Sequence, residues 1–153
     1  MADIICVADY ILGKTGAIPT MKLQKLAYYS QAYHLVKHGT VLFNNEIQAW
    51  ANGPVIVDLF EKHRGMFIIS KGNLTLNGDL CRLSDSEKSC INRVIEKLGG
   101  LTGNQLSELT HSEEPWRSQR IGLSDGERSS RIIKPEAIKS FYSSSRCHNP
   151  LFV

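Results

Sequence analysis

A chain of 153 residues with 42% hydrophobic content can bury one core, so we expect a single globular domain. The formal net charge is only +3, and no run of five Lys or Arg residues occurs, which argues against a dedicated nucleic-acid-binding protein. No apolar stretch approaches the roughly 18 residues of a membrane span, and the N-terminus does not look like a signal peptide. Four scattered cysteines without a CxxC pair predict reduced thiols in a cytoplasmic protein rather than a disulfide frame or a zinc site: Cys6, Cys81, Cys90 and Cys147.

Helical periodicity near the N-terminus predicts two helices. The first covers residues 3–12 and ends at Gly13, because apolar residues recur on one face. The second covers residues 21–37, with Thr20 as its N-cap and Gly39 after its last turn. Beside its apolar stripe runs a second stripe that mixes amides, a phenol and an aliphatic residue: Gln24, Tyr28, Gln31 and Leu35. Two such stripes need cover on more than one side, so we expect this helix at the centre of the domain.

The segment after the central helix is interrupted by Gly53 and Pro54, which favour a tight bend. We expect Trp50 to be buried beside this bend and to clamp it. Pro54 is suited to the first position of another helix, which should fade near Gly65. In residues 66–83, two short β-prone runs flank a Lys-Gly-Asn turn, and they predict a small β-hairpin or a mobile loop.

Two capping boxes mark helix starts in the second half of the chain. Ser84 with Glu87 begins a helix that a Gly-Gly pair ends. Thr102 with Gln105 begins a shorter helix that runs into His111.

The last part of the chain predicts a polar loop over residues 118–130, a short strand at Ile132 and Ile133, and a helix that Pro135 opens. The whole pattern predicts a mainly α domain over residues 1–142, with about six helices around a central helix and a small β-hairpin. The serine-rich residues 143–153 are expected to form a flexible C-terminal tail.

His34 and His38 have the four-residue spacing of zinc ligands in HExxH helices. Neither the glutamate base nor a third ligand accompanies them. We therefore expect no metal, and two surface histidines where the helix dipole favours cations.

His111 allows three interpretations. It could be a general base oriented by Glu113 or Glu114, a hydrogen-bonded helix end, or part of a recognition surface with Trp116. The sequence names no nucleophile and no set of oxyanion donors, so we expect no catalytic residue and no cofactor.

Two further groups of polar residues have open interpretations. Gln24, Lys25, Tyr28 and Gln31 form either a buried network under the Gly-Pro bend or a patch that faces a partner. The arginines between residues 117 and 131 could meet an acidic partner or RNA phosphates, but neighbouring acidic residues favour a solvated loop.

Two motifs stand in a fixed order and spacing. The first comprises residues of the central helix and of the bend: Gln24, Lys25, Tyr28, Gln31, Trp50, Gly53, Pro54 and Val55. The second lies within residues 109–116: His111, Pro115 and Trp116. Together they resemble the SocA-like, or Panacea, domain of bacteria and their phages, over most of the chain.

That family consists chiefly of antitoxins, which neutralise a partner toxin by binding it, and one branch delivers a toxin to a protease. The resemblance implies a cytoplasmic antitoxin, bacterial or phage-encoded, that binds a cognate toxin non-covalently. It implies neither a cofactor nor contact with a membrane or with nucleic acid, and it leaves homo-oligomerisation open. The alternatives are a proteolytic adaptor that serves an ATP-dependent protease, with residues 151–153 as a conceivable tether, and an enzyme or metal protein based on His111.

Protein interfaces draw on aromatic and arginine anchors, and this preference nominates contact residues. The candidates for binding the toxin are Tyr29, Tyr33, Phe67, Trp116, Arg117 and Arg120. Because family motifs often mark the scaffold, we also expect the contact surface in less patterned parts, such as residues 66–83 or the arginine-bearing loop.

Overall fold

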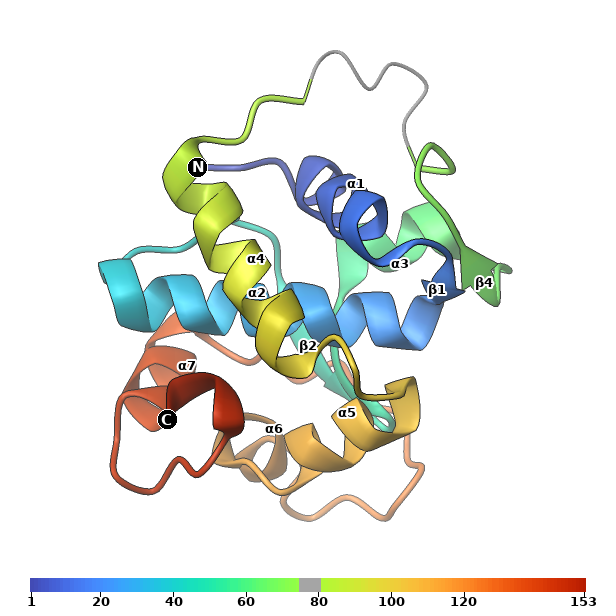
Figure 1. Cartoon of the computed structure of the whole chain (residues 1–153). Coiled ribbons are helices and arrows are strands. Elements are labelled where there is room, and N and C mark those ends of the chain that lie inside the picture. Colours follow the sequence, from blue (N-terminus) through green and yellow to red (C-terminus); the bar gives the residue numbers. More distant parts are fainter. Residues whose placement is uncertain (75–80) are drawn as a thin grey trace.

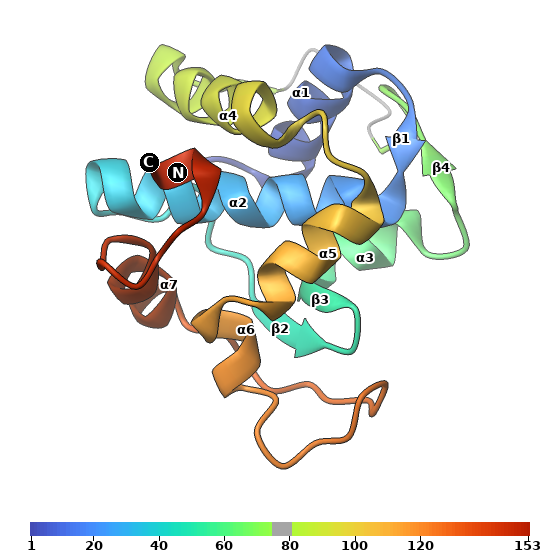
Figure 2. The same cartoon turned by 60° about the horizontal axis from the view of Figure 1, so that its bottom comes forward.

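The computed structural model describes residues 1–74 and 81–153. Helix α2 (Thr20–His38) crosses the middle of the domain, with α1 (Ile4–Thr15) and α4 (Asp85–Leu98) on one side of it (Figure 1). The opposite side is covered by three helices, and a second view preserves this arrangement (Figure 2): α5 (Gly103–His111), α6 (Glu114–Ser118) and α7 (Pro135–Tyr142). The mainly α fold around a central helix is therefore confirmed, with a small β component.

The central position of α2 follows from its sequence. Residues 23–32 are all buried, so both predicted stripes are covered by neighbouring elements. Gly39 ends α2 in the left-handed conformation, as predicted, with φ of 77°. Thr20 is not the N-cap, because Pro19 occupies that position and the Thr20 hydroxyl donates instead to the carbonyl oxygen of Met66.

A β-hairpin follows α2 where a bend and a new helix were predicted. Strands β2 (Ile47–Trp50) and β3 (Gly53–Ile56) pair antiparallel, and Trp50 lies opposite Gly53. The prediction that Pro54 opens a helix is wrong, because α3 (Val57–His63) begins only after β3. A proline is tolerated here because its partner Ala49 donates to the Arg131 carbonyl, so this pair forms no N–H bond across the hairpin. The predicted strand at Ile132 is present as a single antiparallel bridge to Gln48.

The small β-hairpin or mobile loop predicted over residues 66–83 lies only partly within the described residues. Strand β4 (Ile68–Ile69) pairs antiparallel with β1 (Ile18–Pro19), which precedes α2. The expected second arm lies mostly in residues 75–80, outside the described part of the chain. Pairing between distant segments leaves no turn signal in the local sequence, so the pattern favoured the nearest possible partner.

The capping predictions in the second half of the chain are confirmed. Ser84 and Thr102 each cap a helix through a reciprocal capping box, at the starts of α4 and α5. Helix α1 is longer than predicted: Gly13 lies inside it, and Gly16, with φ of 77°, ends it.

The last residues pack against the domain, unlike the frayed tail expected from their composition. The side chain of Asn149 accepts from the Leu151 N–H at the start of a 3-10 helix, η2 (Pro150–Phe152). Leu151 is buried, and the Phe152 ring stacks on Tyr142 with centroids 4.9 Å apart. Val153 is the exposed end of this segment.

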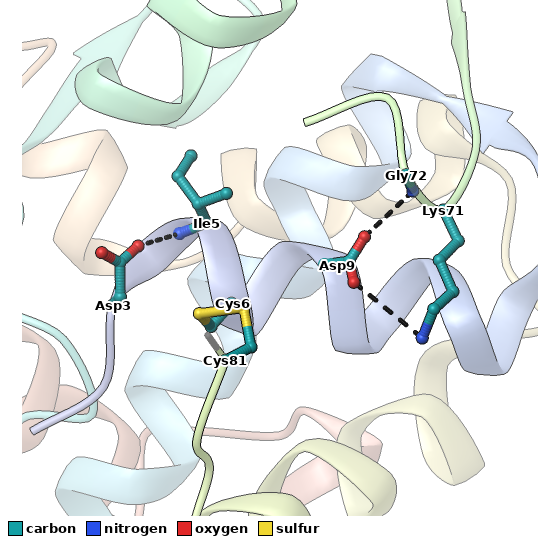
Figure 3. The surroundings of a disulfide bond; sticks show 7 residues. All are labelled: Asp3, Ile5, Cys6, Asp9, Lys71, Gly72 and Cys81. Atoms are coloured by element: carbon teal, nitrogen blue, oxygen red, sulfur yellow. Dashed lines mark hydrogen bonds and ion pairs between the residues drawn. A yellow bond between two sulfur atoms is a disulfide. The ribbon is translucent and has the colours of Figure 1, made fainter. Parts of the chain in front are cut away.

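A disulfide joins Cys6 of α1 to Cys81 (Figure 3). The prediction of reduced thiols is therefore wrong for this pair, while Cys90 and Cys147 are free. The two bonded cysteines are 75 residues apart, so no local spacing could have indicated the bridge. Asp9 of α1 also accepts from the Gly72 N–H at 3.1 Å, so α1 is joined both to Gly72 and to Cys81.

Within residues 1–74 and 81–153, no helix combines the length and the apolar character that crossing a bilayer requires.

Candidate functional site

Gln24 of α2 binds the backbone of β3 in both directions. Its Oε1 accepts from the Ile56 N–H at 2.9 Å, and its Nε2 donates to the Ile56 carbonyl at 3.2 Å. The same Nε2 lies 3.0 Å from Nε2 of His63, whose pKa is lowered by burial, so the neutral imidazole can accept this bond. The amide thus occupies the edge of β3 as a neighbouring strand would.

Gln31, two turns further along α2, holds the loop that follows the helix. Its Oε1 accepts from the backbone N–H of Leu42 at 2.7 Å, and its Nε2 donates to the carbonyl of Phe43 at 2.8 Å. Both family-motif amides therefore satisfy buried backbone groups, which answers the open question in favour of a structural network.

Lys25 lies under the turn of the β2–β3 hairpin. It is 1% exposed, and its Nζ donates to the carbonyl of Pro54 at 3.2 Å. Gly53 has φ of 120°, and a Cβ there would lie 2.5 Å from Cε of Lys25 and 2.9 Å from Oγ1 of Thr110. Only glycine allows the turn to approach the lysine this closely.

The buried ammonium of Lys25 should make stability depend on pH. Burial lowers the pKa of Lys25 to about 7, so between pH 7 and the ordinary value the unfolded chain holds a proton that the folded chain lacks. Stability should therefore rise as pH increases through this range, by about 2 to 3 kcal/mol up to about pH 9. The free energy of unfolding, measured by urea denaturation at several pH values, should not rise in this way for the Lys25→Met variant. It should still rise for Lys62→Met, which changes an exposed side chain. Equal pH profiles for the two variants would refute the assignment.

The second motif holds the hairpin from its other side. Nε1 of Trp116 donates to the carbonyl of Trp50 at 2.7 Å. The His111 ring stacks on Trp116, with centroids 3.9 Å apart and planes 9° from parallel. Arg120 lies over the same indole at 5.6 Å and donates to the carbonyl of Ala49 at 3.3 Å. Trp116, and not Trp50, is therefore the clamp of the bend.

Trp50 itself differs from the prediction of a buried side chain. It is only half-buried, and its ring packs edge-on against Phe60 with centroids 4.9 Å apart. Its Nε1 donates to Gln48 on the same strand at 2.8 Å. The indole therefore lies at the surface between the hairpin and α3.

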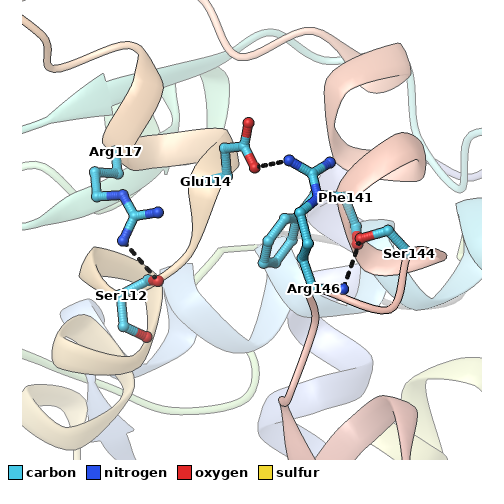
Figure 4. A network of polar contacts seen from close by, with 6 residues as sticks. All are labelled: Ser112, Glu114, Arg117, Phe141, Ser144 and Arg146. Carbon is cyan, nitrogen blue, oxygen red and sulfur yellow. Dashed lines mark hydrogen bonds and ion pairs between the residues drawn. The ribbon is translucent and has the colours of Figure 1, made fainter.

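Among residues 1–74 and 81–153, no carboxylate forms a hydrogen bond with the His111 ring, as the orienting group of a general base would. Its Nε2 lies 3.5 Å from Oγ of Ser107, and its pKa is lowered by burial and by the charges of Lys25 and Arg120. The two predicted orienting residues bind elsewhere: Glu113 to buried hydroxyls, and Glu114 to Arg146 (Figure 4). The geometry favours the structural interpretation of His111, as a platform for Trp116.

Glu113 is the centre of a buried polar cluster. Its Oε1 accepts from the hydroxyls of Tyr29 at 2.5 Å and Tyr142 at 2.7 Å, and its Oε2 accepts from Nδ2 of Asn149 at 2.8 Å. The Tyr28 hydroxyl lies 3.0 Å from that of Tyr142. Burial raises the pKa of Glu113. The cluster ties α2, α7 and the C-terminal residues together.

The six predicted contact residues fall into two groups. Tyr29 and Arg120 are buried, and Tyr33 and Trp116 are half-buried. Phe67 and Arg117 are exposed. Arg117 donates to the carbonyl of Ser112 at 3.3 Å beside the Glu114–Arg146 pair (Figure 4).

Phe67 is the middle of an exposed apolar strip, which we define as residues 66–68. Its side chains are Met66, Phe67 and Ile68, with 40%, 77% and 51% of their surfaces exposed. The strip is fixed in place because the Thr20 N–H donates to the Phe67 carbonyl at 2.9 Å and β4 pairs with β1. Sequence reasoning named Phe67 but missed its neighbours, although three consecutive apolar residues were the available signal.

No group of three or more His, Cys, Asp or Glu residues able to hold a metal occurs in residues 1–74 and 81–153. Nδ1 of His34 lies 2.6 Å from the carbonyl oxygen of Thr40, and Nε2 of His38 lies 3.2 Å from Oγ of Ser86. The pair therefore has partners within the protein.

Comparison with known proteins bears on the scaffold just described. The family model described as the antitoxin SocA-like Panacea domain matches residues 23–117, more than half of the chain. This chain belongs to the SocA-like Panacea family. The Antitoxin SocA of Caulobacter vibrioides (strain NA1000 / CB15N) is 30% identical to it over 128 residues, which cover 74% of this chain and 68% of the relative. No solved structure matches the chain.

The matched segment contains every motif residue of this Panacea domain, from the amides of α2 to Trp116. Membership supports an antitoxin role and implies a toxin as partner. The motif side chains hold the hairpin, the loop after α2 and the buried tyrosines, so they stabilise the fold of the Panacea domain. The exposed strip at residues 66–68 contains none of the motif residues.

Proposed function

We propose that this Panacea domain neutralises a cognate toxin by direct non-covalent binding and carries no reacting group of its own. The observation that supports this most is the apolar strip at residues 66–68, held rigidly on the surface. Exposed contiguous apolar side chains are characteristic of protein interaction sites. A preformed strip also loses little conformational entropy on binding.

Two features favour neutralisation over the alternatives. The C-terminal residues that could have tethered a protease are engaged in the fold, since Leu151 is buried and Phe152 stacks on Tyr142. An enzyme based on His111 lacks support because the ring stacks on Trp116 and neither predicted carboxylate orients it. Binding alone needs neither a tether nor a base.

Replacing the central side chain of the strip should weaken toxin binding without unfolding the domain. The toxin is to be identified as the neighbouring reading frame whose growth arrest this chain relieves on co-expression. Phe67→Ser should raise the Kd for that toxin at least tenfold, as expected for an aromatic anchor, and should abolish growth rescue. Ile121→Ser, changed at a 73% exposed apolar residue of the polar loop, is the matched control and should leave Kd within twofold.

The measurement is biolayer interferometry on purified proteins, with thermal melts to verify folding. Unchanged Kd for Phe67→Ser would remove the strip from the interface. Growth rescue without any complex between the purified proteins would contradict neutralisation by binding.

A further inference from the structure

A cleft of about 960 Å³ opens beside the apolar strip. Its walls come from the first two turns of α2, the β2–β3 hairpin, the end of α3 and residues 128–130. Thr20 belongs to this wall, and its N–H and hydroxyl bind the carbonyls of Phe67 and Met66. The cleft and the strip are therefore continuous parts of one surface.

The charge at the rim of the cleft has one sign. The charged side chains among its lining residues are Arg64 and Arg128, while His63 is neutral and Lys25 is buried. None of the described residues that line it is Asp or Glu. A concave surface lined by charges of one sign concentrates the field and attracts ligands of opposite charge.

Nearby acidic residues offset only part of this charge. Glu61 pairs with Arg64 at 2.6 Å on the outer surface of α3. Glu127, on the loop that carries Arg128, accepts from Ser124 and does not line the cleft. Lys25 donates to the carbonyl of Pro54, and because burial lowers its pKa to about 7 it adds only part of a positive charge at neutral pH.

The cleft also has an apolar wall, where Trp50 and Phe60 meet edge-on and Met21 lies on the α2 side. A half-buried tryptophan beside cationic groups suits a peptide that carries both an apolar side chain and a carboxylate. Hot spots of protein interfaces have this composition, with an aromatic pocket at the centre and charge complementarity around it.

We propose that this cleft receives an acidic segment of the toxin. Its apolar side chain lies against Trp50 and Phe60, and its carboxylate faces Arg64 and Arg128. This inference rests on the proposed antitoxin function, and it names the chemistry that the partner must present.

The test reverses charges at the rim of the cleft, where folding is least affected. Arg128→Glu and Arg64→Glu should each raise the Kd for the toxin about tenfold at low salt, because a like charge then faces the acidic segment. The Kd of the wild type should rise with salt more steeply than that of either variant. Lys97→Glu makes the same charge change on α4, outside the cleft, and should leave Kd within twofold.

A second arm identifies the source of the negative charge. Each Asp and Glu of the toxin is changed to Lys, and one of these toxin variants should restore binding to the Arg128→Glu protein. Polyuridylate serves as the competing anion and should neither bind the wild type tightly nor displace the toxin.

The outcomes separate this inference from the proposed function. If the wild type binds the toxin and all three charge reversals bind it equally well, the cleft inference is overturned and neutralisation by binding stands. If polyuridylate binds in an Arg128-dependent manner while toxin binding does not change, the cleft is an RNA site and the inference is overturned. If the wild type forms no complex with the toxin, both fall together.

Discussion

Gly53→Ala should lower the free energy of unfolding by about 2 to 6 kcal/mol. Two physical causes combine at this position. The φ of 120° is strained for any residue with a Cβ, at a cost of about 1 to 3 kcal/mol. The new methyl would also overlap Cε of Lys25 and Oγ1 of Thr110, and overpacking a buried site costs about 1 to 3 kcal/mol more.

Gly122→Ala is the matched control for this prediction. Gly122 also has a positive φ, of 84°, but a Cβ there would meet nothing within 4 Å. The free energy of unfolding of Gly122→Ala should therefore fall only by the cost of backbone strain, about 1 to 2 kcal/mol. Urea denaturation of both variants measures the difference. Equal losses would show that the hairpin turn does not rest on Lys25 as described.

Glu113→Leu should be the most damaging substitution of a polar side chain, with a loss on the order of 3 to 5 kcal/mol. The carboxylate accepts from three buried donors, on Tyr29, Tyr142 and Asn149, and leucine accepts from none. Each buried donor left without a partner costs about 1 to 3 kcal/mol, which outweighs the relief from no longer burying a carboxyl group. The C-terminal residues should also loosen, because Asn149 loses its anchor.

The adjacent residue provides the control. Glu114 pairs with Arg146 at the surface, where both side chains are substantially exposed. Surface ion pairs contribute little, so Glu114→Leu should cost less than about 1 kcal/mol in the same denaturation experiment. Similar losses for the two variants would contradict the central place given to Glu113.

Local signals in the sequence predicted helix limits well. The hydrogen bonds of the capping boxes at Ser84 and Thr102 each join residues three positions apart. The end of α2 at Gly39 depends on the left-handed backbone conformation of that one glycine. Such features need no tertiary information. The double-striped character of α2 likewise indicated its central place, because a helix side that is neither charged nor solvated must be covered.

Features that depend on distant partners were beyond sequence reasoning. The pairing of β4 with β1 joins segments separated by α2, the β2–β3 hairpin and α3, and the Cys6–Cys81 bridge spans 75 residues. The serine-rich composition of residues 143–153 suggested fraying, but Asn149 finds a buried carboxylate contributed by another element. In each case the partner residue is too distant in the sequence for a local hydrophobic pattern to indicate the contact.

The candidate site shows the same division. The motif positions pointed correctly to the hairpin, the loop after α2 and the corner at Trp116, but they identified the scaffold. Tyr29 was nominated for partner contact as an aromatic residue, whereas the structure buries it against Glu113. The apolar strip and the basic cleft have no sequence motif. Their proximity depends on a tertiary contact, in which Thr20 of α2 binds the carbonyls of Met66 and Phe67.

Hydrogen–deuterium exchange on the domain, alone and with its toxin, tests most directly the claim that the strip and the cleft form the binding surface. Our account predicts slower exchange in the complex at residues 18–21, 64–69 and 126–131, with little change in α7 and residues 143–153. Protection concentrated on α7 and the C-terminal residues, with residues 64–69 unaffected, would contradict it.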